Sequence, residues 1–124
     1  MRKQLPSISL IDVTTSLDGT VKYRQRLAGT NLFNLYGREI TGLSLAQIYP
    51  EAEAEAWAEQ LDVICRDRSP AYGEHDLSWR GMDGVRVAWV RLPLSSNGQD
   101  VDMILGYDAV IGSLRISPSG VCAA

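Results

Sequence analysis

Two short segments near the start of the chain have the composition and alternation of β-strands. Residues 8–14 are rich in β-branched residues and alternate in part between apolar and polar positions. Residues 21–28 place Tyr23 and Leu27 on one face and the basic residues on the other. The Asp18-Gly19 pair between the two segments is a turn signal, so we expect a hairpin with one buried face.

The clearest helical pattern follows Pro50, a residue that suits a first helical turn. Trp57, Leu61 and Ile64 recur at the i, i+4 and i+7 spacing of one apolar helix face. Carboxylates gather at the start of this segment and arginines near its end, as the helix dipole favours, and a Ser-Pro pair stops it. Residues 30–49, which precede it, are divided by glycines into short helical turns.

Three more strands are expected in the second half of the chain, at 72–79, 85–94 and 101–109. Turn sequences at 81–84 and 95–98 separate them, and such short connections require antiparallel neighbours. The order of elements is therefore two strands, short helices, one longer helix and three strands. This order predicts an α+β domain.

The composition is that of an ordinary globular chain and excludes several classes of function. The chain has 124 residues, of which 45% are hydrophobic and 22% are charged, which suits one domain. Its net charge is −3 and its arginines are scattered among acids, so we expect no nucleic-acid partner. No apolar segment approaches the roughly 18 residues of a membrane span. We expect a cytoplasmic protein without membrane insertion.

Four motifs in the same order resemble a small bacterial PAS-like family of the alphaproteobacterial type. They are Arg-Leu-Ala-Gly-Thr at 26–30, Tyr-Gly-Arg-Glu-Ile-Thr-Gly at 36–42, Leu-Pro-Leu-Ser at 92–95, and Val-Asp-Met-Ile-Leu-Gly at 101–106. The likeness covers roughly residues 8–109. It implies a five-stranded antiparallel sheet with a helical connector and one longer helix packed on one face.

The resemblance also implies how the chain is divided. We expect an N-terminal extension at 1–7, a PAS-like domain at 8–110 and a flexible C-terminal tail at 111–124, where alternation is lost and Ser, Pro and Gly become frequent.

In PAS domains the cavity lies between the inner sheet face and the helices, which points to a set of large side chains as candidate pocket residues. They are Tyr23, Phe33, Tyr36, Trp57, Leu61, Trp89, Met103 and Leu105. Simple core packing is the alternative for all of them, because each gains about 1.5–3 kcal/mol by burial.

Arg26 and Arg91 interrupt strands that are otherwise apolar, so they are candidate polar pocket residues. If either faces inward, it requires a carboxylate or an anionic ligand. Of these two possibilities we expect the carboxylate, in an ion pair of the arginine with Glu39 or Asp102.

The sequence does not favour cofactor or metal chemistry. His75 is the single histidine, and PAS haem sensors usually take their axial ligand from the long helix, which contains none here. The segment that follows the first short helix lacks the cysteine that flavin photosensors of the LOV class require. Zinc needs about four Cys or His ligands, which this chain does not provide in one place. We therefore expect no metal, haem or flavin.

The resemblance to PAS domains implies a non-catalytic sensory or regulatory module of signal transduction. Its expected partner is a signalling protein or a second copy in a dimer, bound through the sheet face, and a small metabolite in the interior is a further expectation. The alternative is a small cone-shaped isomerase-like enzyme that uses His75 and Asp76 in an apolar pocket. Adjacent strand residues point to opposite faces, which argues against this pair.

Overall fold

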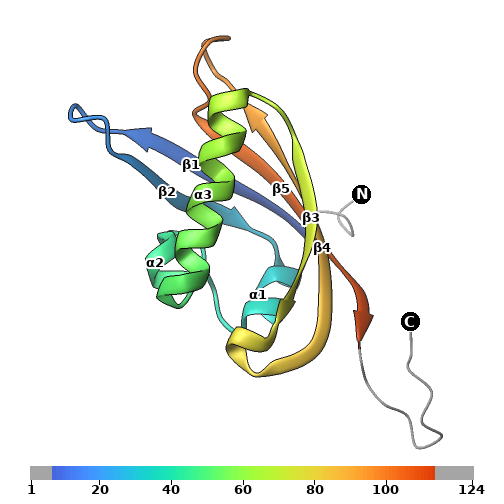
Figure 1. The fold of residues 1–124 in the computed structure, drawn as a ribbon. Helices are drawn as coiled ribbons and strands as arrows, with labels where there is room; N and C mark the ends of the chain where they lie inside the picture. The colour runs from blue at the N-terminus through green and yellow to red at the C-terminus, as the bar shows by residue number, and fades with distance from the viewer. Residues whose placement is uncertain (1–6, 114–124) are drawn as a thin grey trace, which may run out of the picture.

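The computed structural model describes residues 7–113 and shows one five-stranded antiparallel sheet with helices on one side (Figure 1). The elements are β1 (Ile8–Thr15), β2 (Val21–Ala28), α1 (Thr30–Tyr36), α2 (Leu45–Ile48), α3 (Glu51–Asp67), β3 (Ala71–Leu77), β4 (Met82–Leu94) and β5 (Met103–Ser113). The strand order is β2-β1-β5-β4-β3, so the early hairpin joins the late strands through β1 and β5. The predicted α+β, PAS-like architecture is confirmed.

The β1–β2 hairpin turns where the sequence indicates it, at Asp18-Gly19. Gly19 has a φ of 88°, a left-handed conformation that favours glycine. The pairing of the two strands shifts between Leu10 and Ile11. This bulge turns Leu27 away from the side of Tyr23 and leaves it 48% exposed, so the expectation that the two share a buried face is wrong.

Helix α3 crosses the inner face of the sheet in the view of Figure 1. Its buried residues Leu61 and Ile64 pack with Ile11, Tyr23 and Ile104 from three strands. A second cluster, at the other end of the sheet, contains residues of α1 and α2. The helices therefore seal the inner face only. No helix within residues 7–113 is long and apolar enough to cross a bilayer.

The turn between β3 and β4 lies earlier than the sequence suggests. Residues Ser78–Arg80 form a single 3₁₀ turn that Gly81 closes with a φ of 85°, and β4 already begins at Met82. The predicted turn at 81–84 was therefore misplaced. The physical reason is Trp79, whose ring packs inward against Tyr49 with 5.2 Å between ring centroids.

The last strand also differs from its expected bounds of 101–109, because β5 runs from Met103 to Ser113. Part of the tail that was expected at 111–124 thus belongs to the sheet, and its remainder lies outside the described residues. Of the expected N-terminal extension at 1–7, the structure describes Ser7, which is buried. The division into three parts otherwise stays a prediction.

Apolar side chains form rows across the side of the sheet that no described helix covers. Residues that pair directly share a face, so the registers place Ile8, Tyr107, Val90 and Tyr72 in one row, Leu10, Leu105 and Leu92 in the next, and Met103 with Leu94 in a third. We call these nine residues the outer sheet face. Tyr72 is 84% exposed and Tyr107 is 42% exposed, so this face is apolar and accessible.

Candidate functional site

A buried ion pair lies on the inner face of the sheet, between β4 and β5. The Nη1 and Nη2 atoms of Arg91 donate to the two carboxylate oxygens of Asp108 at 2.6 and 3.2 Å. The two side chains are only 5% and 1% exposed. Burial opposes the charge on the guanidinium, but the carboxylate outweighs it, so the pKa of Arg91 lies above its usual value.

Aromatic rings enclose this pair on the side of the helices. The Arg91 guanidinium carbon lies 5.2 Å from the ring centroid of Trp57 and 5.6 Å from that of Trp89. Tyr36 and Tyr49 lie close by, with their hydroxyl oxygens 3.1 Å apart. Burial raises the pKa of Tyr49 to about 12 and that of Tyr36 well above its usual value, so both are neutral donors.

The cavity beside the ion pair has a volume of about 10 Å³ and is lined by Tyr36, Tyr49, Trp57, Arg91 and Asp108, among others. This volume is comparable to that of one water molecule. The expected pocket between the inner sheet face and the helices is thus filled by side chains.

Gly106 makes room for the ion pair. A Cβ atom at this position would lie 2.9 Å from Arg91 Nη1 and 2.6 Å from Ser9 Oγ. Gly106 faces Arg91 directly across the β4–β5 register. The glycine of the Val-Asp-Met-Ile-Leu-Gly motif therefore has a packing role.

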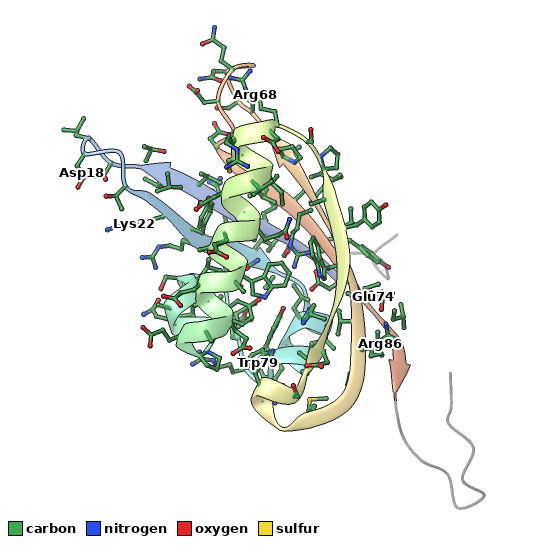
Figure 2. All side chains as sticks on the ribbon, in the orientation of Figure 1. Asp18, Lys22, Arg68, Glu74, Trp79 and Arg86 are labelled. Carbon is green, nitrogen blue, oxygen red and sulfur yellow. The ribbon has the colours of Figure 1, made fainter. Side chains whose placement is uncertain are left out.

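A second hollow lies at the surface, between α3 and the edge strand β3. This tryptophan cleft has a volume of about 400 Å³ and is lined by Glu53, Ala56, Trp57, Gln60, Glu74, His75, Asp76, Trp79 and Trp89. Figure 2 shows Trp79 near the N-terminal end of α3 and Glu74 on the side of β3 away from that helix.

Two features of β3 shape this cleft. Gly73 pairs with Trp89, and a Cβ atom at Gly73 would lie 2.8 Å from the Trp89 ring, so the missing side chain lets the indole lie against β3. His75 faces the same side as Gly73 and meets Trp57 edge-on, with 5.5 Å between ring centroids. Trp57 lines both the cleft and the small internal cavity, and so separates them.

The environment of His75 keeps its ring neutral. Nδ1 lies 3.1 Å from the backbone carbonyl oxygen of Asp76, which only accepts hydrogen bonds, so Nδ1 carries the proton. Burial lowers the pKa of His75, and Arg91 adds to this effect, while the Asp76 carbonyl and the Asp108 carboxylate oppose it. Nε2 is buried and has no hydrogen-bond partner among the described residues.

Of the candidate pocket residues, the structure brings Tyr36, Trp57, Trp89 and Arg91 together around the ion pair. Leu61, on the face of α3 that packs against the sheet, is fully buried in the core. Tyr23 is also buried there, and its hydroxyl donates to Asp62 of α3.

Other candidates lie elsewhere. Met103 and Leu105 belong to the outer sheet face, because β5 turns Ile104, Gly106 and Asp108 inward instead. Phe33 is 47% exposed on α1. For these residues the expectation of a pocket position is wrong, since β5 is apolar on both faces and alternation does not show which one is buried.

The candidate polar residues also separate. Arg26 is exposed and pairs with Asp12 at 3.4 Å. Glu39 is exposed and accepts hydrogen bonds from Thr41, which lower its pKa. Asp102 accepts hydrogen bonds from Ser96 in the loop before β5.

The partner of Arg91 is therefore Asp108, and the expected pairing with Glu39 or Asp102 is wrong. Asp108, Tyr49, Trp79 and Glu53 were not among the site residues expected from the sequence. The spacing of Glu53, Trp57 and Gln60 at i, i+4 and i+7 was a usable signal for one wall of the cleft.

His75 and Asp76 do not form a catalytic dyad in this geometry. The Asp76 carboxylate accepts hydrogen bonds from the Ser78 amide and hydroxyl at 3.1 and 2.7 Å, which lower its pKa. The imidazole instead meets the backbone carbonyl. Within residues 7–113 there is no group of three His, Cys, Asp or Glu side chains placed to hold a metal ion.

A broader groove of about 1,410 Å³ lies between the β1–β2 hairpin and α3 and includes Tyr23, Asp62 and Cys65. Its one buried hydroxyl, that of Tyr23, is already bonded to Asp62. It offers less chemistry than the ion pair and the tryptophan cleft do.

Comparisons with known proteins agree with this architecture. The structure resembles that of the PAS domain from Bordetella pertussis BvgS, with a TM-score of 0.65, 16% sequence identity, and coverage of 87% of this chain and 79% of that one. No curated protein matches the sequence. A family model described as PAS domain matches residues 2–108. The chain therefore belongs to the PAS domain family.

Proposed function

We propose that this PAS domain is a sensory or regulatory module of signal transduction that acts through protein contact, and that its outer sheet face binds a second copy of the chain. PAS domains serve as sensory and regulatory modules, which supports the general role. The observation that carries the specific proposal is the apolar outer sheet face, on which nine apolar residues form three cross-strand rows.

The charges near this face favour a second copy as the partner. On β3 and β4, Glu74 and Arg86 pair with each other, and on β1 and β2, Asp12 pairs with Arg26. The rim is therefore neutralised within each molecule. Two such faces can meet without a row of like charges opposing each other, which an isologous dimer requires.

Signalling by such a module is a shift between two populations. A ligand or partner that binds one arrangement of the helices better than another changes the fraction of molecules whose outer face is ready to bind. The internal cavity holds about one water molecule, so a metabolite inside the core is not supported in this state. The proposal involves no catalytic step.

The experiment is sedimentation equilibrium over a range of protein concentrations, with two matched variants. Tyr107→Glu places a carboxylate on the outer sheet face of both partners, and we expect the dimer to weaken by about a hundredfold or more, because like charges in an interface cost several kcal/mol. Phe33→Glu is the control, since Phe33 is 47% exposed and Tyr107 42% exposed, but Phe33 lies on α1.

A wild-type protein that stays monomeric at millimolar concentration refutes the dimer, and the output then passes through another protein. Equal dissociation by the two variants refutes the assignment to the outer sheet face.

A further inference from the structure

The tryptophan cleft combines features that select a positively charged ligand. All three tryptophans of the chain line it. Trp57 and Trp89 meet at 63° with 5.1 Å between centroids, so their rings form a corner rather than a stack. Indole faces attract cations more strongly than the other aromatic side chains do.

The charge around the cleft has the complementary sign. Glu53 lines it from the first turn of α3 and makes no ion pair with the residues that the structure describes. Glu74 and Asp76 also contribute atoms to its lining from β3, but the Glu74 carboxylate pairs with Arg86 and the Asp76 carboxylate accepts hydrogen bonds from Ser78. The unpaired negative charge of the lining is therefore that of Glu53. No lysine or arginine of the described chain lines this cleft. A cation entering from solvent therefore meets an acidic, aromatic wall.

His75 adds a requirement for a donor. Since Nδ1 carries the proton, Nε2 presents a buried lone pair that no described residue satisfies. A buried acceptor without a partner is unfavourable, and a ligand with an N–H group removes this penalty. A quaternary ammonium has no N–H and does not.

Arg91 shows that these indoles accept a guanidinium. It packs on Trp57 and Trp89 from the inside of the domain, at 5.2 and 5.6 Å from their centroids. Its charge is neutralised by Asp108 at 2.6 Å, so it does not repel a second cation on the solvent side. The outer parts of the same rings face the cleft.

We propose that the tryptophan cleft binds a small organic cation with N–H donors, an alkylammonium or alkylguanidinium, held between the indoles, paired with Glu53 and donating to His75 Nε2. This site is distinct from the internal cavity beside the ion pair and from the outer sheet face. Cation binding at this site requires no self-association, so the proposal can be tested independently of the dimer.

The chain provides its own reporter, because every tryptophan lies in the cleft. Intrinsic fluorescence is titrated at constant ionic strength with n-butylguanidinium, n-butylammonium, tetramethylammonium and n-butylurea, which is the neutral isostere of the first. We expect saturable changes with the first two, none with n-butylurea, and binding about tenfold weaker for tetramethylammonium, because it lacks the hydrogen bond.

Matched variants locate the site. Glu53→Gln should weaken n-butylguanidinium binding about three- to fivefold, as expected for a partly screened ion pair. Glu51→Gln is the control, because Glu51 lies in the same helical turn but does not line the cleft, and it should bind as the wild type does. His75→Phe should bring n-butylguanidinium down to the affinity of tetramethylammonium, with folding checked by circular dichroism.

Three results would overturn the proposal. These are the absence of saturation with both N–H cations, equal binding of n-butylurea and n-butylguanidinium, and equal effects of the Glu53 and Glu51 variants. The last comparison decides the matter even if His75→Phe does not fold. Tyr107→Glu, which tests the dimer, should bind the cation unchanged, so failure of one proposal is distinguishable from failure of the other.

Discussion

Substitution of Asp108 by asparagine tests the buried ion pair directly. The change keeps the size of the side chain but leaves the guanidinium of Arg91, which is 5% exposed, without a counter-charge. Removing one partner of a buried pair lowers the free energy of unfolding by about 3–5 kcal/mol. The contacts of Arg91 with Trp57 and Trp89 contribute about 0.5–2 kcal/mol and exist in both proteins, so they do not compensate.

Urea denaturation followed by far-ultraviolet circular dichroism measures this loss. With a slope of about 1.5 kcal/mol per molar urea for a domain of this size, the midpoint should fall by about 2–3 M. Asp102→Asn is the control, because Asp102 bonds Ser96 in an exposed loop, and we expect a change below about 1 kcal/mol.

A double variant separates charge from packing. Arg91→Met with Asp108→Leu removes both charges and keeps apolar volume, so it should be more stable than Asp108→Asn alone. Two results would contradict this account of the ion pair. One is a free energy of unfolding of Asp108→Asn within about 1 kcal/mol of the wild-type value, and the other is a double variant that is less stable than Asp108→Asn.

Three further outcomes are expected. Gly106→Ala should lower the free energy of unfolding by about 1–3 kcal/mol in urea melts, because its Cβ would lie 2.9 Å from Arg91 Nη1; unchanged stability would contradict this contact. Burial lowers the pKa of His75 in the folded state below its usual value, so the unfolded chain binds the proton more readily and stability should decrease as the pH falls from 7 to 5. His75→Phe should flatten the dependence in that window, and an unchanged slope would assign it to other groups. Tyr23→Phe removes the hydroxyl that donates to Asp62 and should lower thermal stability by about 1 kcal/mol in calorimetry, whereas a neutral result would mean that water replaces the bond.

Local patterns in the sequence were sufficient for most of the fold. The turn at Asp18-Gly19 and the helix after Pro50 depend on interactions between near neighbours, and both lie where the sequence indicates. Leu27 and the turn before β4 were misplaced because a bulge in one case and the packing of Trp79 in the other depend on distant residues.

The candidate site could be predicted only in part, because it also depends on contacts between residues far apart in the sequence. Arg91 could be identified as a charge within an apolar strand, but its partner depends on the register between β4 and β5, which the sequence does not show. The inner and outer residues of β5 were exchanged, because both sets are apolar apart from Asp108. The burial of Asp108 is explained by Gly106 on the same face of β5, because the missing side chain leaves room for Arg91 to reach the carboxylate.

The pleat of the central strands has one more consequence. Arg91 and Asp108 face the interior, while their immediate chain neighbours Val90 and Tyr107 face outward, and Arg91 Nη1 donates to the Val90 carbonyl at 2.9 Å. Interior chemistry and exterior surface are thus separated by the thickness of a single peptide layer. A rearrangement of the Arg91 guanidinium would displace the backbone at Val90 through this hydrogen bond, and so would move the outward side chains without any intermediate residue.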